Sequence, residues 1–195
     1  GCPHNTSTRV PEGSCALAGV GCHLMATWMN RDTQVVSQMG GEGVAWVGVA
    51  PFSGTRHVFA NMGDGTYYHS GLLAIRAAVA AGVDITSKLL YNDAVAMTGG
   101  QHVDGPLSVP QLTRQLAAEG VSRIVVVASD VERYRSVGDL APGTVVVGRE
   151  AFDRVQLELR ATRGVSVLVY DQLCATEKRR RTRRGELARD GEHVL

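Results

Sequence analysis

The chain has 195 residues, of which 44% are hydrophobic, and a formal net charge of +1 from 20 Lys and Arg against 19 Asp and Glu. This length and apolar content suit one globular domain with a full core, and the balanced charge argues against a protein that binds nucleic acid through overall basicity. No apolar run approaches the roughly 20 residues that cross a bilayer, and no basic-then-apolar signal sequence opens the chain. We therefore expect a cytoplasmic protein whose partners include neither a membrane nor a nucleic acid.

Residues 3 to 50 contain many turn formers and few strand signals, which predicts loops that approach a ligand or another backbone closely. Within them, Leu24–Met29 is expected to form a short helix. We interpret Met25, Met29 and Met39 as core packing residues. Glu42, in a Gly-Gly-Glu-Gly sequence, is interpreted as a solvated loop carboxylate rather than a catalytic acid, because nothing in the sequence shows it buried.

A strand–turn–helix–strand pattern follows. An apolar run at Val58–Ala60 ends in the turn Gly63-Asp64-Gly65. A helical pattern covers Ser70–Ala81, and a second apolar run, Lys88–Tyr91, ends in Asn92-Asp93. This order predicts two parallel strands joined by a right-handed crossover. We therefore expect Asp64 and Asn92 to lie side by side at the carboxyl edge of the sheet, where open α/β sheets bind ligands.

The residue types at this edge suit a divalent cation and a phosphate. A carboxylate oxygen of Asp64, an amide oxygen of Asn92 and a nearby backbone carbonyl form a hard-oxygen set that suits Mg²⁺, with substrate phosphates completing the shell. Gly65 and Thr66 lead into a helix amino terminus, whose free N–H groups and dipole favour a phosphate. The alternative is that both clusters are ordinary tight turns.

The rest of the chain alternates between helix and strand patterns. The expected elements are a helix over Leu107–Gly120, strands over Arg123–Ala128 and Thr144–Val147, a helix over Glu150–Thr162 and a strand over Val165–Tyr170. Continuous apolar strands are typical of parallel sheets covered on both faces. The predicted fold class is therefore α/β, a doubly wound and mainly parallel sheet with helices on both faces. The last strand would deliver Asp171 and Cys174 to a strand end.

The chain has four cysteines, Cys2, Cys15, Cys22 and Cys174. Nothing indicates secretion, and spaced cysteines in a cytosolic enzyme bind metal more often than they form disulfides. Iron–sulfur clusters of the four-iron type take four thiolates. From the residues alone, Cys22 could equally be an inert buried thiol.

The segment Lys178–Arg184 is the strong charge run of the sequence. Such a run is compatible with a nucleic-acid patch, with a docking site for an acidic protein or with a solvated face. The chain lacks the interleaved aromatic residues of a nucleic-acid binder. Docking and a solvated face remain as alternatives.

These motifs together resemble a known family. The matching phrases are GCPHNTSTRVPEGS, GVGCH, QMGGEGV, GDGTYYHSG, YNDAVAMTGGQ and YDQLCATEKRRR, which span nearly all of Gly1 to Arg184. They are similar to the thiamine-binding portion of the indolepyruvate:ferredoxin oxidoreductases, which are 2-oxoacid:ferredoxin oxidoreductases. GDG followed at this distance by Asn-Asn or Asn-Asp is the signature of thiamine diphosphate enzymes.

The resemblance implies thiamine diphosphate, Mg²⁺ and a [4Fe-4S] cluster as cofactors. Asp64, Asn92 and the backbone carbonyl of Ala94 would hold Mg²⁺. Cys2, Cys22 and Cys174 would hold the cluster, while Cys15 lies outside the family pattern and is expected to be a bystander. The expected cofactor-contacting residues are Gly21, Cys22, His23, Gly63, Asp64, Gly65, Thr66, Ala96, Met97 and Thr98. The segment 41–43 is expected to line the same cleft.

The resemblance also implies an activity, the oxidative decarboxylation of an aryl 2-oxoacid such as indolepyruvate, with coenzyme A as acyl acceptor and ferredoxin as electron acceptor. In the family, the glutamate that contacts the aminopyrimidine ring comes from a separate pyrimidine-binding domain, which does not fit in this chain. We therefore expect residues 1–175 to be the diphosphate- and Mg-binding domain with iron–sulfur ligands, and residues 176–195 to be a basic segment that leads to an absent region. The expected chain is a fragment that is inactive alone, whose partners are the remaining domains or subunits of a homo-oligomeric enzyme.

Two other readings compete with this one. A non-oxidative thiamine diphosphate decarboxylase or carboligase would share the GDG turn and the asparagine but would have no use for Cys22 and Cys174. A non-enzymatic binding module that uses the basic segment on nucleic acid would have no response to thiamine diphosphate.

Overall fold

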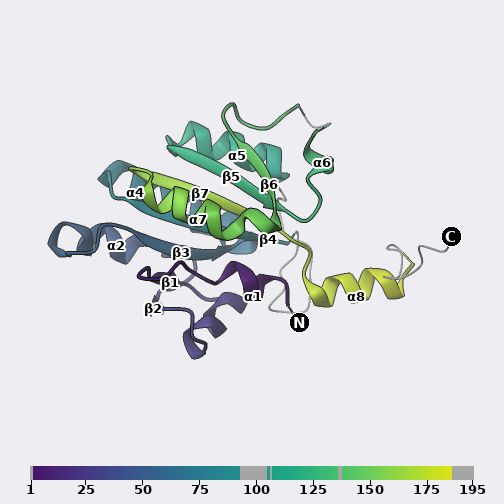
Figure 1. Cartoon of the computed structure of the whole chain (residues 1–195), viewed down its shortest axis with the longest axis horizontal. Coiled ribbons are helices and arrows are strands. Elements are labelled where there is room, and N and C mark those ends of the chain that lie inside the picture. Colours follow the sequence, from purple (N-terminus) through teal and green to yellow (C-terminus); the bar gives the residue numbers. More distant parts are fainter. Residues whose placement is uncertain (1, 93–104, 106, 136–137, 186–195) are drawn as a thin grey trace.

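A seven-stranded sheet organises the part of the chain that this computed structural model describes, residues 2–92, 105, 107–135 and 138–185 (Figure 1). The strand order is β2-β1-β3-β4-β7-β5-β6, and every pair of neighbours runs parallel. The strands are β1 (Ala16–Ala18), β2 (Thr33–Val36), β3 (Val58–Gly63), β4 (Ile85–Tyr91), β5 (Arg123–Ala128), β6 (Val145–Gly148) and β7 (Val165–Asp171). The helical elements are α1 (His4–Ser7), η1 (Cys22–Trp28), α2 (Val44–Val49), η2 (Ala50–Phe52), α3 (Asp64–Thr66), η3 (Tyr67–Gly71), α4 (Leu72–Ala81), α5 (Val109–Ala118), α6 (Glu132–Arg135), η5 (Arg149–Ala151), α7 (Phe152–Ala161) and α8 (Ala175–Arg183). The predicted α/β class is confirmed.

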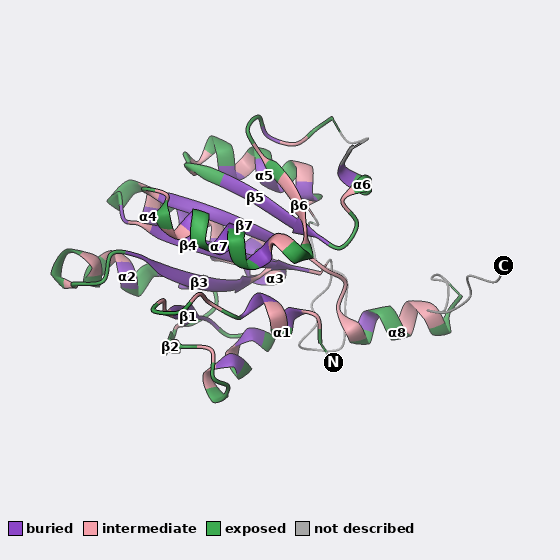
Figure 2. Cartoon of the chain, in the orientation of Figure 1, coloured by how far each residue is buried: buried purple, intermediate pink, exposed green. Residues whose placement is uncertain are grey.

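Helices cover both faces of the sheet, and each face has its own apolar core. On one face, Trp46 of α2, Ile75 of α4 and Leu112 of α5 pack with side chains of β3, β4 and β7. On the other, Phe152 and Leu159 of α7 pack against β5 and β7, and α1 contacts β4. The central strands are therefore buried along their length (Figure 2), as their continuous apolar sequences predict. No helix in the described part of the chain combines the length and apolar character that a membrane span needs.

The elements expected after residue 106 are confirmed, with bounds that shift by at most two residues. Helix α5 begins where its sequence predicts. The Ser108 side chain accepts from the backbone N–H of Gln111, and the Gln111 side chain accepts in return from the backbone N–H of Ser108. This reciprocal capping satisfies two donors that the first helical turn would leave unpaired.

The helix predicted to begin at Ser70 begins six residues earlier, at Asp64. Helices α3, η3 and α4 follow one another without a gap from Asp64 to Ala81, and η3 has π-helical geometry. The sequence does not indicate this start, because the two glycines of Gly-Asp-Gly weaken the helical pattern. Helical geometry therefore begins directly at the end of β3, and π-helical turns of this kind are frequent at functional sites.

The first 50 residues hold more regular structure than their sequence indicates. The short strands β1 and β2 extend the sheet beyond β3, and α2 packs on its face. A strand of three residues, as β1 is, is too short for a period-two pattern to identify it. The short helix expected over Leu24–Met29 is present as η1, which begins two residues earlier.

Lys88 lies on the central strand β4 with its side chain fully buried. Its Nζ donates to the backbone carbonyl of Arg9 at 2.7 Å and to Oε1 of Gln156 at 3.3 Å, and it lies 5.3 and 5.9 Å from the ring centres of Phe59 and Phe152. Burial lowers the pKa of Lys88 to about 7, because the charged ammonium loses its hydration. Lys88 thus links the N-terminal segment to the sheet and to α7 through hydrogen bonds, and the burial of its amine costs stability.

We predict that this cost appears as a pH dependence of stability. The folded-state pKa lies below the ordinary value of 10.5, so the unfolded chain binds more protons between pH 7 and about 10 and stability rises across that window. The Lys88→Met variant lacks this rise, whose slope is limited to about 1.4 kcal/mol per pH unit. Urea unfolding at several pH values measures the difference, with Lys178→Met on the exposed side of α8 as the control. Parallel curves for wild type and Lys88→Met would contradict the prediction.

Candidate functional site

A cavity of about 540 Å³ opens at the carboxyl ends of the central strands. Its wall has three chemically distinct parts: oxygen-bearing loop tips, thiols with two imidazoles, and apolar side chains. The residues that line it are Cys2, His4, Asn5, Thr8, Val20, Gly21, Cys22, His23, Met25, Ala26, Met29, Met39, Gly63, Asp64, Gly65, Thr66, Leu90, Asn92 and Cys174. The cavity therefore gathers both predicted clusters in one place.

Asp64 and Asn92 meet at this edge, as predicted. The register pairs Gly63 of β3 with Leu90 of β4, so both strands end at the same level. The backbone N–H of Asn92 donates to Oδ2 of Asp64 at 2.8 Å, and the N–H of Gly65 donates to Oδ1 at 2.8 Å. Asp64 is only 2% exposed, so these bonds orient a carboxylate that is almost wholly removed from solvent.

The environment of the Asn92 side chain shows whether this residue could be a metal ligand. Its Oδ1 is buried and has no hydrogen-bond partner among the described residues. A buried amide oxygen without a donor is costly, by about 1–3 kcal/mol, and a bound cation would remove that cost. Carboxylate and amide oxygens at one cavity wall fit Mg²⁺. The predicted third ligand, Ala94, lies outside the described residues.

The predicted phosphate-contacting residues also line the cavity. Gly63, Gly65 and Thr66 do so where the helical run begins. The expected contacts at Ala96, Met97 and Thr98 lie outside the described residues.

Cys2, Cys22 and Cys174 line the same cavity although they lie far apart in the sequence, and all three are free thiols. Burial, followed by the neighbouring thiols of Cys174 and Cys2, raises the pKa of Cys22. Cys15 is partly buried against the main core instead, as expected for a bystander. The three predicted thiols therefore line one cavity, and thiolates are the ligands that iron–sulfur clusters take. Among the described residues, no group of three or more His, Cys, Asp or Glu side chains is arranged to hold a metal ion.

Two buried imidazoles, His4 and His23, stand beside these thiols. Burial lowers the pKa of each to about 4, so both rings are neutral near pH 7. The backbone N–H of Gly19 donates to Nε2 of His23 at 3.2 Å, which places the proton of that ring on Nδ1. His23 was a predicted contact; His4, Asn5 and Thr8 were not, although the phrase GCPHNTST contains all three.

The apolar wall overturns one prediction. Met25, Met29 and Met39 were expected in the core, but they are 52%, 42% and 46% exposed and line the cavity with Val20 and Leu90. A methionine pattern cannot separate a core from the wall of an apolar cavity, because both select flexible apolar side chains. These residues provide an adaptable apolar surface beside the thiols.

Glu42 overturns a second prediction, because it is buried, with 2% exposure, rather than solvated. Its Oε2 accepts from the backbone N–H of Gly40 at 2.8 Å, while Oε1 has no hydrogen-bond partner among the described residues. Burial raises the pKa of this carboxyl group. A Cβ atom at Gly19 would collide with the Glu42 carboxyl, so the side chain fills the space under the loop that leads to Cys22.

The segment 41–43 does not line the cavity, contrary to expectation. Gly43 instead has a φ of +86°, and a Cβ there would lie 2.9 Å from Ile85 and 3.2 Å from Ala60. This glycine is needed because the start of α2 approaches the sheet closely in a left-handed conformation. The Gly-rich loop therefore serves backbone packing beside the cavity.

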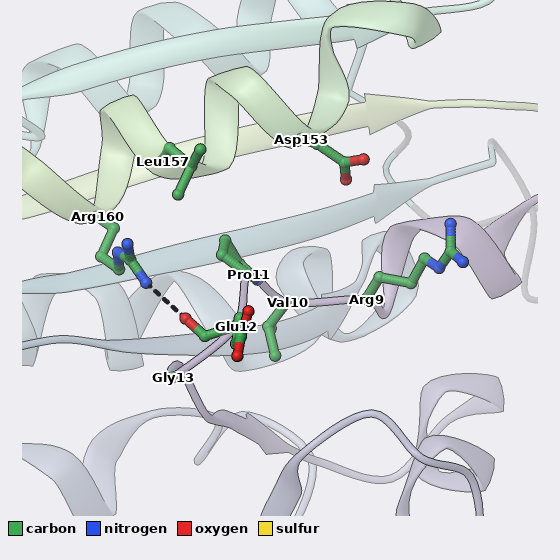
Figure 3. Close-up of a pocket in the computed structure, with 8 residues that line it drawn as sticks. All are labelled: Arg9, Val10, Pro11, Glu12, Gly13, Asp153, Leu157 and Arg160. Atoms are coloured by element: carbon green, nitrogen blue, oxygen red, sulfur yellow. Dashed lines mark hydrogen bonds between the residues drawn. The ribbon is translucent and has the colours of Figure 1, made fainter.

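A second hollow, about 700 Å³ in volume, lies between residues 9–13 and α7 (Figure 3). Arg160 crosses it and donates to the backbone carbonyl of Glu12 at 3.0 Å and to Oγ of Ser14 at 2.9 Å. Asp153 and Leu157 form its α7 side. None of the predicted site residues lies there, so it serves as a comparison surface for experiments.

The basic run lies on α8, which projects away from the sheet (Figure 1). Cys174 is the residue at its amino end, and the carbonyl of Cys174 accepts from the N–H of Lys178 at 2.8 Å. Glu177 is buried and accepts from Arg180 and Arg181 at 3.1 Å each. The helix therefore begins at the thiol cluster and carries its exposed basic groups outward from it.

Comparisons with known proteins agree with this geometry. Residues 19–128 match the family described as thiamine pyrophosphate enzyme, C-terminal TPP binding domain. No curated protein matches the chain. The matched span contains Cys22, Asp64 and Asn92, that is, the oxygen-bearing edge and one of the three thiols.

Many solved structures share the fold, and two of them illustrate it. One is a 2-oxoglutarate:ferredoxin oxidoreductase from Magnetococcus marinus with 2-oxoglutarate, coenzyme A and succinyl-CoA bound; it is 15% identical, with a TM-score of 0.64 over 83% of this chain and 55% of that chain. The other is benzoylformate decarboxylase from Polynucleobacter necessarius, 16% identical, with a TM-score of 0.57 over 84% of this chain and 31% of that chain. The chain therefore spans about half of the first structure and less of the second.

We predict that Glu42 makes stability fall with rising pH. Its folded-state pKa is raised above the ordinary value of 4.5, so above pH 4.5 the folded state binds more protons than the unfolded chain and loses stability until its own pKa is passed. The Glu42→Gln variant does not lose this stability. The melting temperature of the variant should therefore increase relative to that of wild type as pH rises from 4.5 toward neutrality. Thermal melting across that range tests this, with the exposed Glu12→Gln as the control. A constant difference between Glu42→Gln and wild type would refute it.

Proposed function

This chain belongs to the thiamine pyrophosphate enzymes, as their C-terminal TPP-binding domain, and we propose that it serves a ferredoxin-dependent oxidoreductase that decarboxylates aryl 2-oxoacids oxidatively to acyl-CoA. The observation that carries the proposal is the shared cavity: the Asp64–Asn92 edge and the thiols of Cys2, Cys22 and Cys174 line the same wall. A thiamine site alone does not require the thiols.

In this proposal Asp64 and Asn92, with the carbonyl of Ala94, would hold the Mg²⁺ that accompanies the diphosphate. The buried, unpaired Oδ1 of Asn92 supports this role. The remaining cofactor contacts are Gly21, Cys22, His23, Gly63, Gly65, Thr66, Ala96, Met97 and Thr98. When bound, thiamine diphosphate supplies the carbanion chemistry of 2-oxoacid decarboxylation, and the protein supplies position and electrostatics.

In this proposal Cys2, Cys22 and Cys174 would hold a [4Fe-4S] cluster, which would supply one-electron chemistry between the cofactor site and ferredoxin. Their place in the same cavity wall supports a short path for electrons. The rings of His4 and His23 are buried and neutral, and they line the same cavity as the thiols.

The apolar wall supports an aryl substrate. Met25, Met29 and Met39 offer flexible apolar surface with polarisable sulfur, which favours an aromatic ring. Among the described residues that line the cavity there is no Lys or Arg, whereas a dicarboxylate such as 2-oxoglutarate calls for a cationic partner. Coenzyme A is the proposed acyl acceptor.

The complete enzyme needs further domains or subunits, including the one that contributes the activating glutamate. Exposed apolar side chains on η1 and β2 support a covering partner. Trp28 is 79% exposed on η1, and Val35 and Val36 are 44% and 43% exposed on the edge strand β2. We propose that the chain acts within such a homo-oligomeric assembly and has no turnover alone.

A non-oxidative decarboxylase is the second candidate, favoured by the shared fold of benzoylformate decarboxylase. Anaerobic reconstitution with iron and sulfide separates the two. The oxidoreductase proposal expects a broad visible absorbance that is lost in Cys22→Ser and in Cys174→Ser and retained in Cys15→Ser. Absorbance that is absent from wild type would favour the decarboxylase.

We predict that thiamine diphosphate with Mg²⁺ raises the melting temperature of the chain. A ligand at 100 times its Kd adds about 2.7 kcal/mol, or roughly 5 to 10 °C for a domain of this size. Asp64→Ala and Asn92→Ala should abolish the shift, because each removes a proposed Mg²⁺ ligand. Asp153→Ala, in the second hollow, should keep it. A full shift in Asp64→Ala would exclude this edge as the cofactor site.

We predict further that α8 docks ferredoxin. Arg179 and Arg183 are exposed on this helix, and complementary charge speeds the encounter with an acidic partner. Reversing both to Glu should raise the KM for ferredoxin about tenfold at low salt in the complete enzyme, with kcat for an artificial electron acceptor unchanged. The control reverses Arg56 and Arg123, which are exposed near the amino ends of β3 and β5. An unchanged KM for ferredoxin would rule out docking at α8.

A further inference from the structure

His4 makes a long-range hydrogen bond at the edge of the thiol cluster. It lies in α1, two positions after Cys2, and is almost fully buried. Its Nε2 lies 2.9 Å from the backbone carbonyl oxygen of Gln172, which is 168 positions away in sequence and two positions before Cys174. Because a carbonyl can only accept, Nε2 carries the proton and donates. The bond therefore joins the segment that carries the first thiol to the segment that carries the last.

The segment that contains Gln172 is itself held at the sheet edge where Asp64 lies. The backbone N–H of Gln172 donates to the carbonyl of Tyr91 at 3.0 Å. The other side of that same peptide group, the N–H of Asn92, donates to Oδ2 of Asp64 at 2.8 Å. His4 is thus the outer member of a chain of hydrogen bonds that begins at the Asp64 carboxylate.

The ring of His4 is also held against rotation. It packs edge-on against Tyr170, with ring centres 5.6 Å apart and an angle of 61° between planes. At the backbone, Oγ of Ser7 donates to the carbonyl of His4 at 2.8 Å. Helix α1 has four residues, too few to be stable without tertiary contacts. Its placement, and that of Cys2 before it, therefore depends on bonds such as the one from His4.

We propose that His4 is a positioning residue, which holds the N-terminal segment so that the thiol of Cys2 faces those of Cys22 and Cys174 before any cluster is bound. The use of this preformed set for a cluster rests on the function proposed above, but the positioning itself does not. Nε2 is committed to a backbone carbonyl, so the ring acts by holding the segment rather than by binding a ligand through that nitrogen. A site whose thiols are already in place loses less conformational entropy when the cluster is assembled.

Three substitutions at one position separate the hydrogen bond from the packing. His4→Phe keeps a ring against Tyr170 and removes the donor. The amide nitrogen of Gln reaches about as far as Nε2, whereas that of Asn reaches only as far as Nδ1. His4→Gln should therefore restore the bond to Gln172, and His4→Asn should not. His57→Phe is the matched control, because His57 is a buried histidine whose Nε2 bonds Thr86 at 2.7 Å in the sheet, away from the thiols.

The test measures thiol proximity in the full chain without a cluster. In a Cys15→Ser background, dibromobimane, which becomes fluorescent when it bridges two thiols, is added, and mass spectrometry locates the bridged pairs. We expect wild type, His4→Gln and His57→Phe to form bridges that include Cys2. His4→Phe and His4→Asn should form them at least about fivefold more slowly, while the Cys22–Cys174 bridge keeps its rate. Bridging of Cys2 at the wild-type rate in both His4→Phe and His4→Asn would overturn the proposal.

A second measurement distinguishes this proposal from the function it builds on. Iron content and the electron paramagnetic resonance spectrum of the reduced protein are recorded after reconstitution, and a thiamine diphosphate melting shift verifies that each variant is folded. If wild type takes up no cluster while bridging still depends on the donor at position 4, the positioning role stands and the redox function fails. If wild type and His4→Asn take up the same cluster with the same spectrum and bridge alike, the redox function stands and the positioning role fails. Should His4→Phe not fold, the comparison of His4→Asn with His4→Gln decides.

Discussion

The parallel alignment of three adjacent strands is the constraint on which the whole site depends. The register pairs Gly63 with Leu90, and Leu90 with Tyr170. Strands β3, β4 and β7 therefore end at the same edge of the sheet. Residues that directly follow these strands therefore lie close together without any additional structural element. The bond from the Asn92 N–H to the Asp64 carboxylate is the first contact that this alignment makes possible, and the segment that carries Cys174 joins it through Gln172.

The cavity and the loop packed beside it contain buried polar groups whose burial costs stability. Oδ1 of Asn92 and Oε1 of Glu42 are buried without hydrogen-bond partners among the described residues, and His4 and His23 are held neutral by burial. Each is a cost that a stable core would avoid. Such costs collect where a ligand or a reaction requires them. The sheet and its two apolar cores provide the stability that offsets the cost of these buried polar groups.

Much of this arrangement can be read from the sequence, and the rest depends on tertiary contact. The crossover from Val58 to Asn92 is predictable because long apolar strands and turn residues are local signals, and one alignment rule then brings Asp64 and Asn92 together. Burial is not a local property. The sequence predicts Glu42 as a solvated loop residue and Met25 as a core residue, yet the first is buried and the second is exposed in the cavity. Glu42 is buried because it packs against Gly19, which is distant in the sequence.

His4 and β1 illustrate two other limits. The hydrogen bond of His4 spans 168 positions, so no local pattern signals it, although the GCPH phrase places the residue next to a predicted ligand. Strand β1 has three residues and exists because β2 and β3 flank it. What sequence reasoning identifies well is which residue types reach the edge; what it misses is how the loops above that edge are held.

The central claim, that the oxygen-bearing edge and the thiols share one cavity, has one direct test. A nitroxide spin label is attached to Cys22 in a chain whose other cysteines are serine, and Mn²⁺ replaces Mg²⁺ in the presence of thiamine diphosphate. We expect strong dipolar broadening of the nitroxide spectrum that requires thiamine diphosphate and disappears in Asp64→Ala. A nitroxide spectrum that is unchanged when Mn²⁺ and thiamine diphosphate are bound would contradict it.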